Sequence, residues 1–197
     1  MNLFEIIGAV IGLFYIVSEY RADRWFWPLS LLMSAFYAVI DFTSGIYANG
    51  AICVYNFVMS VYGLLVWRGV IQSKTKEERS ISSCPRRYWW QLVLLAVVLS
   101  VALTWLLGLL HESRYTLTNG LTVDLSLLDG ISSALTIVGM LMLAQKWWQQ
   151  WFCWMLVEPM MIVIFVLTGN YASAVLYAVF EVFCILGIIR WKKESIS

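Results

Sequence analysis

The chain of 197 residues has a mean hydropathy of +0.79, with 61% hydrophobic and only 13% charged residues. Because soluble domains are about half apolar and about a quarter charged, this composition excludes an ordinary soluble enzyme and a disordered chain. The formal net charge of +1 excludes the strongly basic surface typical of a nucleic-acid-binding protein.

Apolar runs separated by short polar breaks predict seven membrane-spanning helices, since about 20 apolar residues cross a bilayer. Their expected ranges in chain order are 3–20, 26–44, 48–67, 89–110, 127–145, 149–168 and 171–190. The first run lacks a preceding basic segment and a following small-residue cleavage site, so we expect a retained span and not a signal peptide. The sequence therefore predicts an all-α, multi-pass membrane protein.

Basic residues lie almost entirely on one side of the predicted membrane. With alternating spans, twelve of the thirteen Lys and Arg residues fall on the side of the C-terminus, and only Arg114 falls on the other. Basic loops stay in the cytoplasm, so we expect the N-terminus outside and the C-terminus inside. A different number of spans would scramble this asymmetry.

The chain repeats itself at a constant offset of 124 residues, without a gap. The matched positions are turn glycines, tyrosines and tryptophans: Gly45 with Gly169, Tyr47 with Tyr171, Gly63 with Gly187, Trp27 with Trp151, and Trp67 with Trp191. This pattern predicts a parallel 3+1+3 repeat, which is one recurring plan among transporters. Residues 1–67 and 127–197 would form the two three-helix bundles, and 68–126 would hold the connector span and its loops.

Polar and small residues follow one face of each repeat helix at helical spacing. Lipid-facing sides must be apolar, so we expect these stripes to face inward around a polar centre. The connector span offers only Ser100 and Thr104. For the glycines and serines of the stripes, close packing between helices is the alternative explanation.

Carboxylates within the spans do not fit the packing explanation, because a charge at membrane depth costs about 3 kcal/mol or more. Four acids lie near span ends, where we expect interfacial water to hydrate them: Glu5, Glu19, Asp41 and Asp129. Glu158 and Glu181 lie near span centres, where no Lys, Arg or His lies deep enough to pair with them. These two carboxylates therefore predict a hydrated cavity or a cationic ligand.

Glu158 is the sharper candidate for a binding residue. Trp154 and Trp151 precede it by about one and two helical turns, and Pro159 follows it and predicts a kink. Indole faces beside a carboxylate suit a flat cation, since each cation–π contact contributes about 0.5–2 kcal/mol. Trp151 is equally compatible with an anchor at the membrane interface.

Most of the eleven tryptophans lie at predicted span ends, where we expect them to form interfacial belts. These are Trp25, Trp27, Trp67, Trp89, Trp90, Trp147, Trp148 and Trp191. The four cysteines form no C-x-x-C pair and His111 is the single histidine, so neither a metal site nor a cofactor is expected. Nucleotide-binding and hydrolase motifs are also absent from the sequence, so no catalytic residue is expected.

The order of short motifs resembles the Pnu family of bacterial vitamin transporters, which has a SWEET-like fold. The matching stretches are Glu5-Ile6-Ile7-Gly8, Gly45-Ile46-Tyr47-Ala48, Val61-Tyr62-Gly63 with Trp67, Asp129, Ala144-Gln145-Lys146, and the series Trp151, Trp154 and Glu158. In the family's nicotinamide riboside carriers (PnuC) the last motif usually reads W-x-x-x-N. Here Trp154 keeps the first position and Glu158 replaces the Asn. Since a carboxylate suits the aminopyrimidine and positive thiazolium of thiamine, the resemblance is closest to the thiamine transporters (PnuT).

The resemblance implies uptake of a small cationic vitamin through the bacterial inner membrane. Transport would be facilitated diffusion by alternating access, made one-way by phosphorylation of the vitamin in the cytosol. Thiamine is the first expectation, and nicotinamide riboside or another cationic vitamin is the alternative. A proton-coupled carrier stays open, because Glu158 and Glu181 could titrate. An intramembrane enzyme or a non-transporting membrane subunit is the competing class.

The expected substrate-binding residues combine aromatic, acidic and hydroxyl or amide groups. They are Trp154, Glu158, Asn56, Tyr177, Glu181, Trp151, Ser34 and Tyr37. Asn56 would stand in for a family amide whose position is Cys53 here. Membrane lipid is the expected surrounding, nucleic acid is not an expected partner, and self-association is left open.

Overall fold

The computed structural model describes residues 3–43, 47–71, 79–117 and 119–196. Its helices are α1 (Leu3–Tyr20), α2 (Phe26–Thr43), α3 (Tyr47–Trp67), α4 (Arg86–Leu110), α5 (Ser126–Ala144), α6 (Gln150–Leu167) and α7 (Tyr171–Glu194). Each helix begins and ends within four residues of its predicted range. The prediction of an all-helical architecture with seven long helices is therefore confirmed for the described residues.

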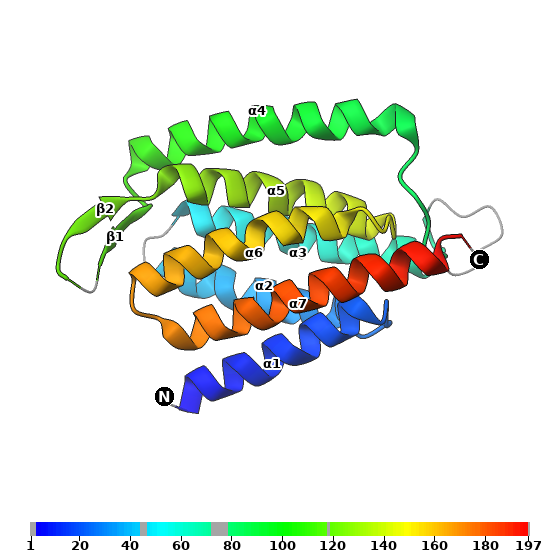
Figure 1. Ribbon diagram of the computed structural model, residues 1–197, viewed down its shortest axis with the longest axis horizontal. Coiled ribbons are helices and arrows are strands. Elements are labelled where there is room, and N and C mark those ends of the chain that lie inside the picture. The colour runs from blue at the N-terminus through cyan, green and yellow to red at the C-terminus, as the bar shows by residue number, and fades with distance from the viewer. Residues whose placement is uncertain (1–2, 44–46, 72–78, 118, 197) are drawn as a thin grey trace.

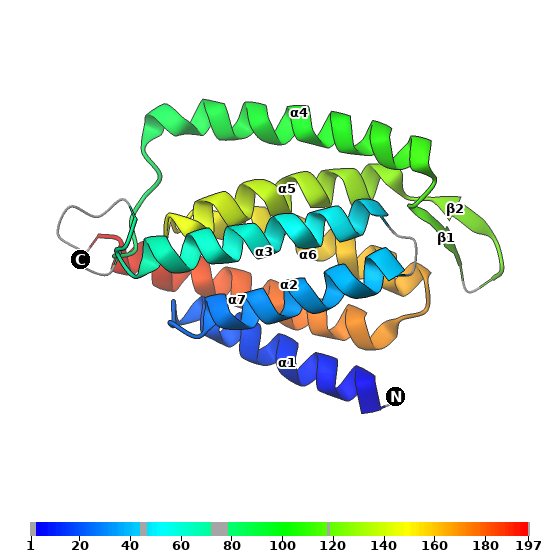
Figure 2. The same ribbon diagram turned by 180° about the vertical axis from the view of Figure 1, so that it is seen from behind.

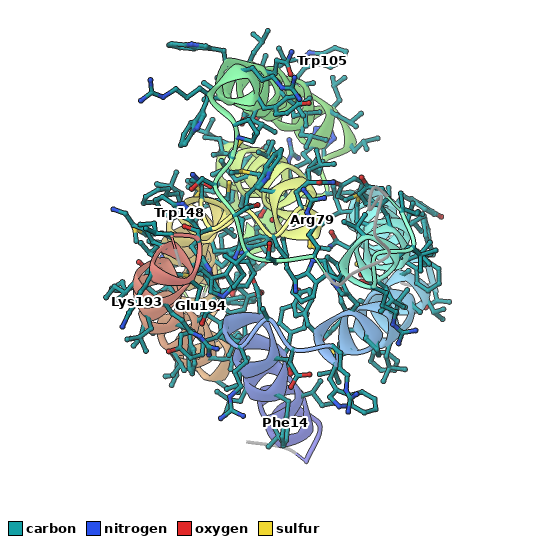
Figure 3. The ribbon with its side chains drawn as sticks, turned by 90° about the vertical axis from the view of Figure 1, so that its right-hand side faces the viewer. Phe14, Arg79, Trp105, Trp148, Lys193 and Glu194 are labelled. Atoms are coloured by element: carbon teal, nitrogen blue, oxygen red, sulfur yellow. The ribbon has the colours of Figure 1, made fainter. Side chains whose placement is uncertain are left out.

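Six of the helices form a closed ring, and the seventh lies outside it. Each helix packs against the next in the order α1, α2, α3, α5, α6, α7, and α7 packs against α1. Helix α4 packs mainly against α5 and lies apart from the ring, as the views from the front and from behind show (Figures 1 and 2). Viewed end-on, the ring surrounds a common centre (Figure 3).

Five helices are long and apolar enough to cross a membrane: α3, α4, α5, α6 and α7. In α1 and α2 the described apolar stretches are shorter, Val10–Tyr20 and Phe26–Val39. Large apolar side chains cover the outward faces. On α4, for example, Trp90 is 81% and Trp105 is 68% exposed. Such a surface is suited to lipid and not to water.

Successive helices run in opposite directions along the bundle, so the two chain ends lie at opposite ends of it (Figure 1). We call the end at which α1, α3, α5 and α7 finish the basic end. Ten described basic residues lie there: Arg21, Arg24, Arg68, Arg79, Arg86, Arg87, Lys146, Arg190, Lys192 and Lys193. Lys74 and Lys76 lie outside the described residues. Arg114 lies at the opposite end, in a β-hairpin.

That hairpin is an element the sequence reasoning did not predict. Strands β1 (Arg114–Thr116) and β2 (Thr122–Asp124) pair antiparallel between α4 and α5. Each strand has only three residues and one partly buried side chain, so hydrophobic alternation gives almost no signal. The hairpin leads into α5 through Asp124, whose side chain accepts hydrogen bonds from the Ser126 N–H (2.9 Å) and hydroxyl. These bonds hold the pKa of Asp124 below its usual range.

The same turn ends α1 and α5, 124 residues apart. Ala22 and Lys146 both adopt left-handed backbone, with φ of 52° and 50°. The amides of Asp23 and Trp147 then reach back to the carbonyls of Ser18 (2.9 Å) and Met142 (3.0 Å). This pairing caps a helix C-terminus and turns the chain directly into the next helix.

A segment before α4, Arg79–Pro85, lies across the basic end. Its backbone bonds both ways with the turn between α5 and α6: the Ser82 N–H donates to the Lys146 carbonyl (2.9 Å), and the Ser82 carbonyl accepts from Trp148 (3.1 Å). The Cys84 N–H donates to the side chain of Gln149 (2.9 Å). Burial of the Cys84 thiol raises its pKa to about 11. This segment fastens the peripheral α4 to the ring.

Candidate functional site

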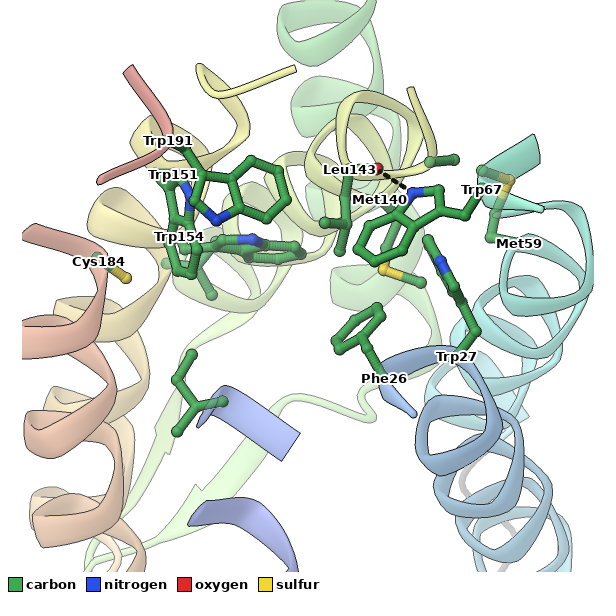
Figure 4. Close-up of a cluster of buried hydrophobic side chains, with 13 residues drawn as sticks. Phe26, Trp27, Met59, Trp67, Met140, Leu143, Trp151, Trp154, Cys184 and Trp191 are labelled. Carbon is green, nitrogen blue, oxygen red and sulfur yellow. Dashed lines mark hydrogen bonds between the residues drawn. The ribbon is translucent and has the colours of Figure 1, made fainter. Parts of the chain in front are cut away.

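Five aromatic rings form a continuous layer near the basic end of the ring of helices. Phe26 and Trp27 come from the start of α2, Trp67 from the end of α3, Trp151 from the start of α6, and Trp191 from the end of α7. Ring centroids lie 5.3 Å apart for Trp27 and Trp67, 6.4 Å for Trp67 and Trp191, and 5.6 Å for Trp151 and Trp191. Figure 4 shows the layer in place between the helices.

Two glycines give the layer its room. A side chain on Gly63 would collide with the indole of Trp27, and one on Gly187 would collide with the indole of Trp151. The two pairs lie 124 residues apart in the sequence. Both indoles are 0% exposed, so each fills a space that only a glycine leaves between two helices.

The layer corrects the expectation that the tryptophans at span ends form interfacial belts. Trp27 and Trp191 are 0% exposed and Trp67 is 4% exposed, so none of the three faces lipid or headgroups. A tryptophan near a span end can point either towards the lipid interface or into the bundle. Only the packing of the helix ends determines which of the two it does. The belt expectation is compatible with the exposed indoles of Trp25 and Trp90, at 59% and 81%.

The Glu158 carboxylate is buried and has acids and tyrosines of neighbouring helices as electrostatic neighbours. It is 6% exposed, and it interacts electrostatically with Glu19 of α1 and with Glu181 of α7. Tyr15 and Tyr177 are further electrostatic neighbours, from α1 and α7. Oxygen Oε2 of Glu158 has no hydrogen-bond partner among the described residues. Acidic groups of three helices therefore lie within electrostatic reach of one another.

Glu19 is a member of this group that the sequence reasoning placed elsewhere. We expected interfacial water to hydrate it, but its side chain is only 2% exposed. The physical reason is the closed basic end: the neighbouring Tyr20 carbonyl accepts a hydrogen bond from the Trp191 indole (2.9 Å), and Ile16 is buried as well. The acid is thus buried on the inner side of α1, within electrostatic reach of Glu158. The side chains of Glu5 and Asp41 lie outside the described residues.

Gln150 and Trp154 bring further polar groups to Glu19. Positions 150, 154 and 158 are spaced by four residues, so they share one face of α6. The side chains of Gln150 and Trp154 face the Glu19 carboxylate. Yet the indole nitrogen of Trp154 and both amide atoms of Gln150 make no hydrogen bond of good geometry to any described residue. The same four-residue spacing could have identified Gln150 from the sequence.

The expected binding residues divide into two groups. Trp154, Glu158, Glu181 and Tyr177 are joined by electrostatic interactions within the ring. Tyr37 of α2 is an electrostatic neighbour of Tyr177, but its side chain is 43% exposed. We call the set formed by Glu19, Gln150, Trp154, Glu158, Tyr177 and Glu181 the acidic cluster.

Trp151 lies in the aromatic layer instead. It is 0% exposed, so it is not an anchor at the membrane interface. Ser34 is buried on α2, and Oδ1 of Asn56 is buried without a partner on α3. In the described part of the chain, no side-chain hydrogen bond or electrostatic interaction joins either residue to the acidic cluster.

The acidic cluster can bind a cation with hydrogen-bond donors. Carboxylates supply negative charge and acceptors, the indole of Trp154 supplies a flat π face, and Gln150 supplies both a donor and an acceptor. The ion pairs Arg114–Asp124 and Arg190–Glu194 both lie outside the cluster. No group of three or more His, Cys, Asp or Glu suited to a metal ion occurs among the described residues.

The comparisons with known proteins now bear on this arrangement. The family described as nicotinamide mononucleotide transporter matches residues 2–193. The chain belongs to this family. This is a family of membrane transporters, and five helices of the chain are able to span a membrane. The chain is therefore a multi-pass protein of the bacterial inner membrane.

Two curated relatives of the chain are the nicotinamide riboside transporters PnuC of Escherichia coli K12 and of Shigella flexneri. Each is 21% identical over 206 residues, covering 97% of this chain and 85% of the relative. Among solved structures, the vitamin B3 transporter PnuC matches with a TM-score of 0.72 at 18% identity, covering 98% of this chain and 81% of the other. That likeness shows a shared fold.

These relatives correct the first substrate expectation. The matches name nicotinamide riboside and vitamin B3, and they do not support the placement nearest the thiamine transporters. Glu158 in place of the family's Asn is therefore not by itself evidence for a thiamine carrier. The physical reason is that both vitamins carry a positive ring, so a carboxylate suits either one.

Proposed function

We propose that the chain carries nicotinamide riboside across the inner membrane by facilitated diffusion. The observation that carries this proposal is the acidic cluster inside the ring of helices, in a chain of the nicotinamide mononucleotide transporter family. The positively charged pyridinium ring would lie against Trp154 with Glu158 as its counter-ion. The ribose hydroxyls would bond to Gln150, Glu19 and Tyr177.

The cluster favours the riboside over the mononucleotide. A phosphate would bring negative charge towards Glu19, Glu158 and Glu181, and the electrostatic neighbours recorded for these acids include no basic side chain. Phosphate sites in proteins normally present Arg, Lys or helix N-termini. The same argument supports trapping after entry, because a phosphorylated product would no longer fit the site.

We further propose that the two halves of the ring rock against each other as a parallel 3+1+3 repeat of SWEET-like type, with residues 1–67 and 127–197 as the halves. Three correspondences at an offset of 124 residues support this: the left-handed turns at Ala22 and Lys146, the Trp27–Gly63 and Trp151–Gly187 contacts, and the perpendicular Trp27–Trp67 and Trp151–Trp191 pairs. The basic end would face the cytoplasm.

A binding titration tests the substrate. Purified protein in detergent is titrated calorimetrically with nicotinamide riboside, thiamine and nicotinamide mononucleotide. We expect saturable binding of the riboside, and binding of the mononucleotide at least tenfold weaker. Tighter binding of thiamine than of the riboside would overturn the proposal.

The variant Glu158→Gln keeps the shape of the side chain and removes its charge. We expect it to bind the riboside at least tenfold more weakly, because a charge-assisted contact contributes about 1.5–3 kcal/mol. Glu194→Gln, at the exposed end of α7, is the matched control and should bind like wild type. Equal affinities of wild type and Glu158→Gln would exclude Glu158 as the counter-ion.

A further inference from the structure

The segment Arg79–Pro85, which we call the strap, contacts both halves of the ring at the basic end. Its middle is attached to the turn between α5 and α6, in the second half. Ser82 exchanges two backbone hydrogen bonds with this turn, and the Ser83 hydroxyl accepts one from the Trp148 indole (2.9 Å). The Cys84 N–H donates to a glutamine side chain of the same turn (2.9 Å). The strap is therefore fixed to the second half along most of its length.

The start of the strap reaches the first half as well. The Arg79 N–H donates to the carbonyl of Trp67, the last residue of α3 (3.1 Å). The Arg79 side chain donates from Nε to the carbonyl of Gln145, the residue that follows α5 (2.9 Å). One residue therefore bonds to the C-terminal ends of two helices that belong to different halves.

Arginine suits this position for an electrostatic reason. The last carbonyls of a helix lack partners within the helix and carry the negative end of its dipole. A guanidinium stays charged and offers five N–H donors in a planar fork. Arg79 places this charge beside the end of α5, while its backbone amide holds the end of α3.

Other contacts close the same seam, where α3 packs against α5. The Gln145 amide donates to the Tyr62 hydroxyl (2.9 Å), and Nζ of Lys146 lies 4.3 Å from the centre of the Trp67 ring. Ile81 of the strap packs against the buried core that contains the aromatic layer. The strap thus lies against the core of the ring as well as against its helix ends.

The attachment of the strap to the two halves is unequal. Residues 82–84 bond to the second half through backbone and side-chain groups, whereas the contact with the end of α3 runs through the backbone of Arg79. A movement that separates α3 from α5 therefore acts on the strap at Arg79 first.

We propose that the strap is a latch for the basic end, and that the contact of Arg79 with α3 is the part that opens. Arg79 is a positioning residue, because its guanidinium fixes the strap on α5 so that its backbone amide can hold α3. When the halves separate, the strap moves with the second half. The inference rests on the proposed function, because it takes the rocking of the halves as the transport movement.

Two native cysteines report on the latch without any substrate. Cys184 is 0% exposed in the core of the ring, and Cys84 is 5% exposed within the strap. An impermeant maleimide is added to right-side-out and to inverted membrane vesicles, and mass spectrometry measures the alkylation of each cysteine. Labelling of Ser195→Cys in the same vesicles identifies the side to which the basic end faces.

We expect Arg79→Gln to raise the alkylation rate of Cys184 several-fold from the side of the basic end, and not from the other side. Cys84 should react as in wild type, because the strap stays on the second half. Arg86→Gln removes an equal charge at the exposed start of α4 and is the matched control, with wild-type rates at both cysteines. A wild-type rate at Cys184 in Arg79→Gln would overturn the inference. Equal acceleration from both sides would overturn it too, because that result indicates general loosening of the fold.

The variant Gln149→Ala tests the attachment to the second half, because it removes the acceptor of the Cys84 N–H. We expect faster alkylation of both Cys84 and Cys184, since a strap that is loose on the second half no longer ties the halves together. An unchanged rate at Cys84 would contradict this attachment. Equal acceleration of Cys84 in Arg79→Gln and Gln149→Ala would show that the whole strap leaves the ring, against the proposed movement.

The outcomes for the latch and for the substrate are separate. Riboside binding in the calorimetric titration, together with an unchanged Cys184 rate in Arg79→Gln, would overturn the latch and leave the proposed function intact. Absence of riboside binding would overturn the proposed substrate, while the alkylation of Cys184 would still decide the latch.

Discussion

At the scale of single residues, Gly63 and Gly187 determine where the buried indoles lie. Each glycine allows a tryptophan from the neighbouring helix to approach the helix backbone, at contacts that no other residue type would permit. A side chain at either glycine would collide with the indole that now fills the space. The aromatic layer thus depends on glycine at positions 63 and 187 as much as on the rings themselves.

We expect Gly63→Ala and Gly187→Ala each to destabilise the protein by about 1–3 kcal/mol, as overpacked cores do, because the new methyl group meets a ring enclosed on all sides. The measurement is the thermal unfolding midpoint of the purified protein, which should fall for both variants. Gly108→Ala on α4 is the matched control, since its nearest neighbour is the Ser126 hydroxyl at 3.8 Å. An unchanged midpoint in both variants would contradict the packing argument.

At the scale of helices, two indole hydrogen bonds join the two halves of the ring at the basic end. The Trp67 N–H of α3 donates to the Leu143 carbonyl of α5 (3.1 Å), and the Trp191 N–H of α7 donates to the Tyr20 carbonyl of α1 (2.9 Å). Each bond runs from the last helix of one half to the first helix of the other. In the proposed rocking motion, opening of the basic end would require both bonds to break.

We expect Trp67→Phe and Trp191→Phe to favour the state that is open at the basic end, because each loses about 0.5–1.5 kcal/mol of net hydrogen-bond stabilisation. Cys184, which is 0% exposed and lies near Glu158, is a native reporter of this opening. Its alkylation by a water-soluble maleimide, followed by mass spectrometry, should be several-fold faster in both variants. Trp90→Phe, at a position 81% exposed, should leave the rate unchanged. Equal rates in all four proteins would mean that these bonds do not hold the end closed.

At the scale of the whole molecule, the alternating directions of seven helices place the hairpin and the C-terminal residues at opposite ends. The distribution of basic residues predicts that the hairpin faces outward and the C-terminus inward.

We therefore expect a cysteine introduced at Thr122 to react with an impermeant maleimide in intact cells, and one at Ser195 to react only after lysis. Both positions lie outside the helices, so neither substitution disturbs the ring. Labelling of Ser195→Cys in intact cells would reverse the proposed orientation.

The sequence predicts the helices well and the interior less well, for one physical reason. Helix positions follow from hydropathy, which the lipid imposes on every span independently. The burial of Glu19 and the inward orientation of Trp67 instead depend on how six helix ends pack together. The sequence of a single span does not contain that information. Glu158 and Trp154 were accessible to sequence reasoning because a carboxylate at the centre of a span needs a reason wherever the other helices lie.

The aromatic layer also gives the molecule an optical property. Trp27, Trp67, Trp151 and Trp191 are shielded from water, and Trp154 faces the acidic cluster. Indole emission responds to the polarity around the ring, and a pyridinium accepts an electron from an excited indole, which quenches that emission. Occupancy of the site would therefore change the intrinsic fluorescence of the protein, so that substrate arrival could be followed in real time without any attached dye.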